Sequence, residues 1–145
     1  MWKISEMACL IVMIALSVKD IKMHKVSAYG LLAAGAASIC YQWVIGKMDI
    51  KLILGGIVVG MLFIVISKVT QEGIGYGDSL GILILGIYLG IWGLLTVVSI
   101  AFFLLLCVMI PLLFIKRMSR KCALPFYPFL TIGYLGLLLM EGVNT

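Results

Sequence analysis

The chain has very little charge and few groups that can do chemistry. Only 12% of its 145 residues are charged and only six are acidic, whereas 64% are apolar. A soluble protein carries roughly 45 to 50% apolar residues. The composition therefore excludes an ordinary soluble protein and indicates an integral membrane protein, and the length predicts a single domain over residues 1–145.

The sequence has too few clustered cysteines and histidines to form a metal site. The four cysteines are scattered without a Cys-x-x-Cys pair, and the one histidine, His24, has no cysteine or second histidine nearby. A zinc site needs several such ligands at close spacing. We therefore expect no metal and no other cofactor, and we expect the cysteines to be buried free thiols: Cys9, Cys40, Cys107 and Cys122.

Long apolar runs are what the sequence has in abundance. A membrane-crossing helix needs roughly 20 mostly apolar residues. The apolar stretches of the chain resolve into six runs: Ile4 to Val18, Val26 to Gly46, Leu52 to Val69, Ser79 to Leu89, Gly93 to Ile115 and Leu124 to Met140. We predict an all-α polytopic membrane protein with six transmembrane helices.

Two apolar stretches differ from a simple membrane span. The first resembles a signal peptide, but Glu6 interrupts it and no small-residue cleavage site precedes Lys19, so we assign it as a transmembrane helix. The stretch from Ser79 to Ile115 is uncharged and too long for one crossing. Gly86, Gly90 and Gly93, together with the aromatic Trp92, predict a tight turn near a membrane interface. This turn leaves a short fourth span buried among its neighbours. Glycines in the third span predict close helix packing: Gly55, Gly56 and Gly60.

The net charge of +5 sets the orientation and does not require nucleic acid as a partner. Eight of the eleven basic residues fall in the first, third and fifth loops. Because positive loops stay in the cytoplasm, both termini should lie outside, and Asp20 and Asp78 should lie at the cytoplasmic face. Asp49 falls on the opposite side and is excluded from a shared site.

Asp20 and Asp78 border apolar runs, where ionisable groups are costly and generally functional. Two carboxylates a few ångströms apart share a proton, so that one acts as a base on water and the other as an acid toward a carbonyl group. This is the chemistry of an aspartyl protease. Plainer interpretations stay open: Asp78 with Ser79 is a good helix N-cap, and Asp20 among lysines fits a solvated loop.

Three further features are candidates for substrate binding. The segment from Glu72 to Asp78 has glycine at every second position, and glycine allows positive φ and close approach of another chain. We expect Gly75 and Gly77 to receive an extended substrate strand, with Glu72 beside them, although pairing with Lys68 explains Glu72 equally well. Pro125 and Pro128 interrupt the start of the last span. They shape the wall of the site or form a kink that neighbouring helices absorb.

Three segments together resemble the type IV prepilin peptidases, a family of GxGD-type membrane aspartyl proteases. The segments occur in the family's order and span nearly the whole chain: Asp20-Ile-Lys-Met-His-Lys-Val-Ser27, Glu72-Gly-Ile-Gly-Tyr-Gly-Asp78 and Leu124-Pro-Phe-Tyr-Pro-Phe-Leu130. The resemblance implies that Asp20 and Asp78 are catalytic. It also implies cleavage of the short basic leader of prepilin-like proteins, after a glycine, at the cytoplasmic face of the cell membrane.

The chain departs from the family pattern at two positions. Ser27 stands where many members have proline, and Leu80 stands where many have lysine, which bears on how substrate is positioned. The paired Cys-x-x-Cys motifs of larger members are missing, so the resemblance is to a short form without the methyltransferase domain. Two alternatives remain: a small ion- or proton-coupled transporter, and a noncatalytic membrane scaffold.

Overall fold

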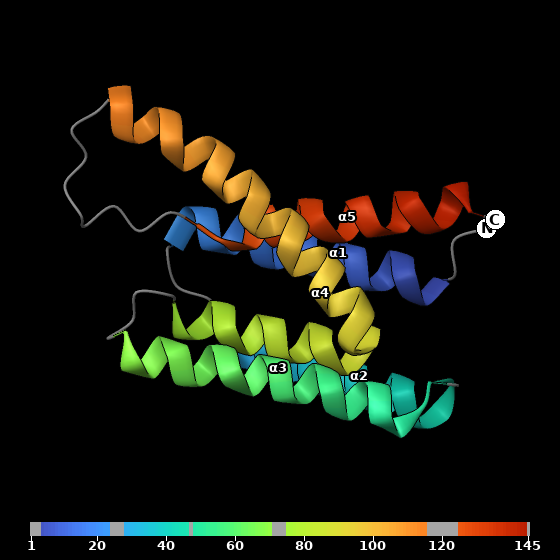
Figure 1. Cartoon of the computed structure of the whole chain (residues 1–145). Helices are drawn as coiled ribbons and strands as arrows, with labels where there is room; N and C mark the ends of the chain where they lie inside the picture. Colours follow the sequence, from blue (N-terminus) through green and yellow to red (C-terminus); the bar gives the residue numbers. More distant parts are fainter. Residues whose placement is uncertain (1–3, 24–27, 47, 71–74, 116–124, 145) are drawn as a thin grey trace. The chain divides into compact units, whose positions relative to one another are not determined.

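The protein is described from a computed structural model covering residues 4–23, 28–46, 48–70, 75–115 and 125–144 (Figure 1). Regular secondary structure in these ranges is entirely helical, which confirms the all-α class. The five helices are α1 (Ile4–Met23), α2 (Ala28–Val44), α3 (Ile50–Val69), α4 (Tyr76–Ile115) and α5 (Tyr127–Val143). Six membrane spans are not shown, because only two of these helices are long and apolar enough to cross a membrane. The residues expected to form the fourth and fifth spans both lie in α4, whose backbone is interrupted at Gly90.

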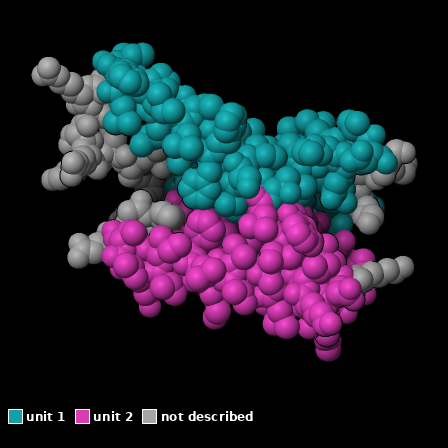
Figure 2. Space-filling model, viewed as in Figure 1, with its two compact units in different colours: residues 1–24, 96–145 teal, residues 25–95 magenta. Residues whose placement is uncertain are grey.

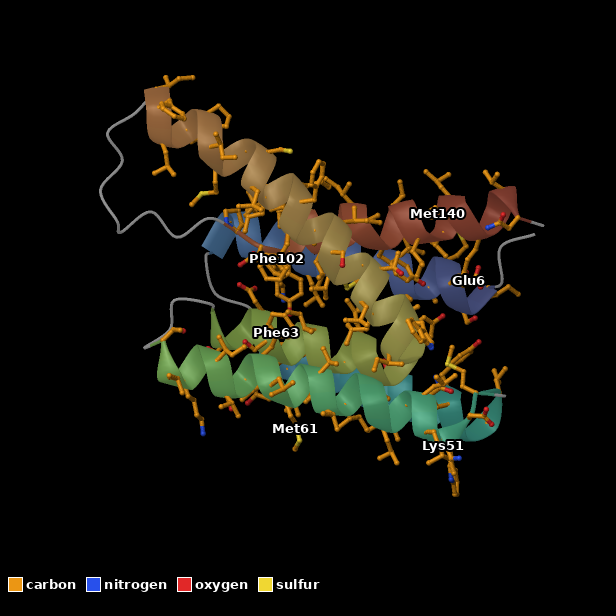
Figure 3. The ribbon with its side chains drawn as sticks, in the orientation of Figure 1. Glu6, Lys51, Met61, Phe63, Phe102 and Met140 are labelled. Carbon is orange, nitrogen blue, oxygen red and sulfur yellow. The ribbon has the colours of Figure 1, made fainter. Side chains whose placement is uncertain are left out.

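Two helices, α3 and α4, are long and apolar enough to cross a membrane. The core helix of a soluble protein is also apolar, but it is mostly buried. Here only 17% of the most apolar stretch of α3 and 11% of that of α4 are buried, and large side chains such as Met61 point outward (Figure 3). The two helices thus suggest a membrane protein. A third helix, α5, is apolar but shorter, with 17 residues.

The backbone of α4 is interrupted at one residue, Gly90, with φ 71° and ψ −177°. Gly90 is the only glycine with positive φ in the described ranges. The turn predicted near Gly86, Gly90 and Gly93 is therefore found at Gly90, where a side chain would be strained. Before it, every residue from Gly77 to Leu89 is buried or half-buried, as expected of a short span among neighbours.

The chain divides into two compact units, each described separately (Figure 2). Unit 1 comprises residues 1–24 and 96–145, and so contains α1, the second part of α4 and α5. Unit 2 comprises residues 25–95, with α2, α3 and the first part of α4.

In unit 2, glycines allow α3 to approach α4 closely. Gly56 faces the carbonyl group of Gly86, and a Cβ on Gly86 would lie 2.6 Å from the carbonyl oxygen of Gly56. A Cβ on Gly60 would lie 2.6 Å from the Cα of Leu83. Backbones this close require small residues, as is common between membrane helices. The close packing predicted for the glycines of α3 is therefore confirmed.

In unit 1, α1 and α5 run antiparallel with a polar seam between them. Ser17 and Thr131 share a hydrogen bond of 2.7 Å between their hydroxyl oxygens, and the hydroxyl of Tyr134 donates to the carbonyl oxygen of Glu6 at 3.5 Å. Gly133 of α5 packs on the backbone of α4 at Val97. Buried apolar side chains of all three segments form the core: Leu10, Met13, Leu16, Val97, Val98, Ala101, Phe126, Leu130, Leu137 and Leu138.

The cysteines differ from expectation in their exposure. Cys9, Cys40 and Cys107 are free thiols, but Cys40 and Cys107 are exposed, so the prediction of burial is wrong for these two. A thiol behaves as a small hydrophobe, so its exposure here resembles that of the many exposed apolar side chains. Cys122 and His24 lie outside the described residues.

Candidate functional site

Asp20 lies inside α1 and not in a loop after it. The helix continues five residues beyond the apolar run, to Met23, and the side chain of Asp20 is only 6% exposed. The interpretation of Asp20 as a solvated loop residue is therefore wrong. It is the one carboxylic acid among the buried residues of the described part of the chain.

The carboxylate of Asp20 accepts a hydrogen bond from the start of α5. Its Oδ2 atom lies 3.5 Å from the backbone nitrogen of Tyr127, the first residue of that helix. Backbone N–H groups in the first turn of a helix have no acceptor within the helix. Asp20 supplies one, and this long hydrogen bond joins two segments that are 107 residues apart.

The two prolines lie at the start of α5. Pro128 is in the first turn of the helix, where its missing N–H is not needed, and Pro125 precedes the helix. The kink proposed as an alternative is therefore wrong: Pro128 helps to begin the helix. The helix accordingly starts at Tyr127, three residues after the start of the apolar run predicted for the last span.

A polar stripe beside Asp20 was not predicted. Ser17 lies one turn before Asp20 on α1, and Thr131 lies one turn after Tyr127 on α5. The hydroxyl of Thr131 contacts that of Ser17 at 2.7 Å and the carbonyl oxygen of Tyr127 at 2.9 Å. The sequence contained a signal for this stripe, because Ser17 and Asp20 are three residues apart and Tyr127 and Thr131 are four apart, which places each pair on one face of its helix. These are the faces on which α1 and α5 meet.

Asp78 lies in the first turn of α4. The helix begins at Tyr76, so Asp78 is its third residue, and Gly75 occupies the N-cap position. The carbonyl oxygen of Gly75 accepts hydrogen bonds from the N–H groups of Asp78 and Ser79, at 3.0 and 3.2 Å. The interpretation of Asp78 as the N-cap is therefore wrong.

Gly75 leaves room for the Asp78 carboxylate. A Cβ on Gly75 would lie 3.0 Å from Oδ2 of Asp78, tighter than most side chains accept. Neither Gly75 nor Gly77 has positive φ, and Gly77 is helical. The positive φ that glycine permits is therefore not used at these two positions, and the reason for glycine at position 75 is space. The substrate strand expected at Gly75 and Gly77 stays a prediction. Glu72 and Gly73 lie outside the described residues.

The residue after Asp78 attaches the start of α4 to α3. Ser79 is fully buried, and its hydroxyl donates to the carbonyl oxygens of Phe63 at 3.3 Å and of Gly75 at 3.4 Å. Phe63 lies on α3. From the sequence, Ser79 was expected only to take part with Asp78 in a helix N-cap. In the structure its hydroxyl contacts α3.

Asp20 belongs to unit 1 and Asp78 to unit 2. The structure brings Asp20 together with the segment that contains Pro125 and Pro128, and Asp78 together with Gly75. The pairing of the two aspartates stays a prediction. Among the described residues, no group of three histidine, cysteine, aspartate or glutamate side chains is arranged to hold a metal ion. Comparisons of the chain with protein-family models, curated proteins and solved structures gave no match.

Proposed function

We propose that the chain is a membrane aspartyl endopeptidase of the type IV prepilin peptidase kind, with Asp20 and Asp78 as its catalytic carboxylates. The observation that carries the proposal is the burial of Asp20, which is 6% exposed in a chain with only six acids. A buried carboxylate is costly and generally indicates a functional site in a membrane protein. The proposal also has the support of the motifs: Asp20 contacts the Leu124–Leu130 motif through Tyr127, and Asp78 follows the glycine-rich segment directly.

The proposed reaction is hydrolysis of a peptide bond by two carboxyl groups. The ionised aspartate takes a proton from water, and the water oxygen attacks the carbonyl carbon while the protonated aspartate donates to the carbonyl oxygen. The neutral diol then collapses: the nitrogen takes the proton held by the first aspartate, and the C–N bond breaks. A hydroxyl proton returns to the second aspartate. The products are a free acid and a free amine, and the pair regains its starting state.

The proposed substrates are prepilin-like proteins with a short basic leader and an apolar helix, cleaved after a glycine at the cytoplasmic face. Six crossings of the bilayer are proposed, two of them from α4. The part from Tyr76 to Leu89 is about 21 Å long and the part from Ile91 to Ile115 about 38 Å, against roughly 30 Å of hydrocarbon. The proposed substrate-binding residues flank the aspartates: Glu72, Gly75, Gly77, Pro125 and Pro128.

Leader cleavage tests the proposal directly. Asp20→Asn and Asp78→Asn, each co-expressed with a prepilin-like substrate, should reduce cleavage by at least about 100-fold, because each removes one general acid or base. The matched control is Asp49→Asn, an aspartate assigned to the opposite membrane face, which should cleave normally. Mass spectrometry of the substrate measures the outcome. Normal cleavage by either Asp20→Asn or Asp78→Asn would contradict the catalytic pair.

A second comparison separates catalysis by Asp20 from its contact with α5. The side-chain oxygen of asparagine can still accept from the N–H of Tyr127, whereas Asp20→Leu removes the acceptor. If Asp20 only stabilises the fold, Asp20→Asn should be active and Asp20→Leu should be unstable. If Asp20 is catalytic, both variants should be inactive, and Asp20→Asn should keep the wild-type resistance to unfolding in detergent.

A further inference from the structure

The helix α4 folds back on itself at Gly90. The backbone there has φ 71° and ψ −177°, far from helical values. A Cβ on Gly86 would lie 3.1 Å from Cδ2 of Leu94. Residues eight apart in a continuous helix are separated by about 12 Å along its axis, so this contact shows that the chain reverses between them.

One side chain from α2 reaches the point of reversal. The amide nitrogen of Gln42 donates to the carbonyl oxygen of Ile87 at 3.0 Å and to that of Tyr88 at 2.9 Å. In a continuous α-helix these two carbonyl groups would accept from the N–H groups of Ile91 and Trp92. Gly90 lies inside both of those hydrogen-bonded turns, so Gln42 supplies N–H groups at the place where the helix is interrupted.

The orientation of the Gln42 amide shows which of its groups matters. Its carbonyl oxygen, Oε1, is buried without a hydrogen-bond partner within the described ranges. The reverse orientation would direct Oε1 at two carbonyl oxygens, which repel it. An unpaired buried oxygen costs free energy. The observed orientation of the amide has this cost, but it places the two N–H groups against the carbonyl oxygens at the reversal.

We propose that Gln42 is the cap that holds α4 in its folded-back form at Gly90, in place of water. This role is independent of the proposed peptidase chemistry, and it rests on the proposed crossing of the membrane by the first part of α4. The first part of α4 is about 21 Å long, shorter than roughly 30 Å of hydrocarbon. A helix of this length that begins at one membrane surface ends short of the opposite surface, so backbone groups at the reversal need partners from the protein. A side chain of the protein meets that need here.

The length of α4 across the reversal provides the test. Spin labels at Tyr76 and Leu95, both exposed, are placed in the full chain with its four native cysteines replaced by alanine and reconstituted in lipid vesicles. In a continuous helix the two positions would be about 29 Å apart. The wild-type protein should show a shorter distance. Gln42→Met, of similar size but without a donor, should increase the ratio of extended to folded-back molecules about sevenfold, equivalent to about 1.2 kcal/mol for two interhelical hydrogen bonds in a membrane.

Two variants serve as controls. Ser38→Ala removes a hydrogen bond within α2, from the Ser38 hydroxyl to the carbonyl oxygen of Ala34 at 2.9 Å, and should leave the distance unchanged. Gln42→Lys keeps a donor that can cap helix carbonyl groups and should retain the wild-type distance. If Gln42→Met matches Ser38→Ala, or if Gln42→Lys shows the extended distance, the capping role is wrong. If Gln42→Met does not fold, the Gln42→Lys variant alone tests the capping role: the wild-type distance supports it and the extended distance contradicts it.

Discussion

Adding one methyl group at Gly86 should push α3 and α4 apart. The new Cβ of Gly86→Ala would lie 2.6 Å from the carbonyl oxygen of Gly56, about 0.7 Å short of the roughly 3.3 Å at which carbon and carbonyl oxygen meet in close helix contacts. The obstacle is backbone and cannot rotate away. Overpacking of this kind costs about 1 to 3 kcal/mol, part of which is offset by the better helix propensity of alanine, up to about 1 kcal/mol.

The matched control is Gly35→Ala in the same unit. A Cβ there would lie 3.6 Å from Cγ1 of Ile84, an ordinary contact with a side chain. Both variants gain the same helix propensity, so their difference isolates the clash, and we expect Gly86→Ala to be about 2 kcal/mol less stable than Gly35→Ala. Unfolding by dodecyl sulfate in mixed micelles, followed by circular dichroism, measures both. Equal stability of the two variants would refute the close approach of α3 and α4.

Two further predictions concern the site and the orientation. Gly75→Ala places a Cβ 3.0 Å from Oδ2 of Asp78, so it should displace the carboxylate and lower leader cleavage about tenfold, because a small displacement of reacting groups is enough for a loss of this order. Stability in the same unfolding assay should not change. Unchanged cleavage would contradict the steric reason for glycine at position 75. Single cysteines at Ser119 and at Met48, in a background without native cysteines, should react with impermeant reagents from opposite sides of the membrane, and labelling of position 119 from outside would overturn the orientation.

The sequence predicted the parts of the fold that depend on local composition. Apolar runs located the helices, and three closely spaced glycines located the reversal in α4, because positive φ is a local property. The end of α1 was placed too early. The run of apolar residues stops at Val18, but Lys19, Asp20 and Lys22 are compatible with a helix, and lysine can extend its amine toward water from the last turn. Hydrophobicity alone therefore marks where a helix becomes polar and not where it ends.

The features missed by the sequence are contacts between distant segments. The carboxylate of Asp20 contacts the backbone of Tyr127, 107 residues later, and the side chain of Gln42 contacts the carbonyl groups of Ile87 and Tyr88, 45 and 46 residues later. Charge counting also passed over Gln42, because a neutral amide does not register as an ionisable group. In an apolar helix that crosses a membrane, however, an uncharged polar side chain needs a partner as an acid does, so its presence in the sequence also indicates a contact between helices.

The contact between Asp20 and α5 is compatible with catalysis and connects the first motif with the third. A carboxylate has two oxygens with about four acceptor positions, and the N–H of Tyr127 occupies one of them, on Oδ2. The remaining positions are sufficient to accept a proton from water. A single contact to a helix end also restricts rotation of the side chain, and preorganised groups of this kind make proton transfer efficient. The Leu124–Leu130 motif then has two roles: Pro128 helps begin α5, and the first N–H group of α5 holds the carboxylate on which the proposed chemistry depends.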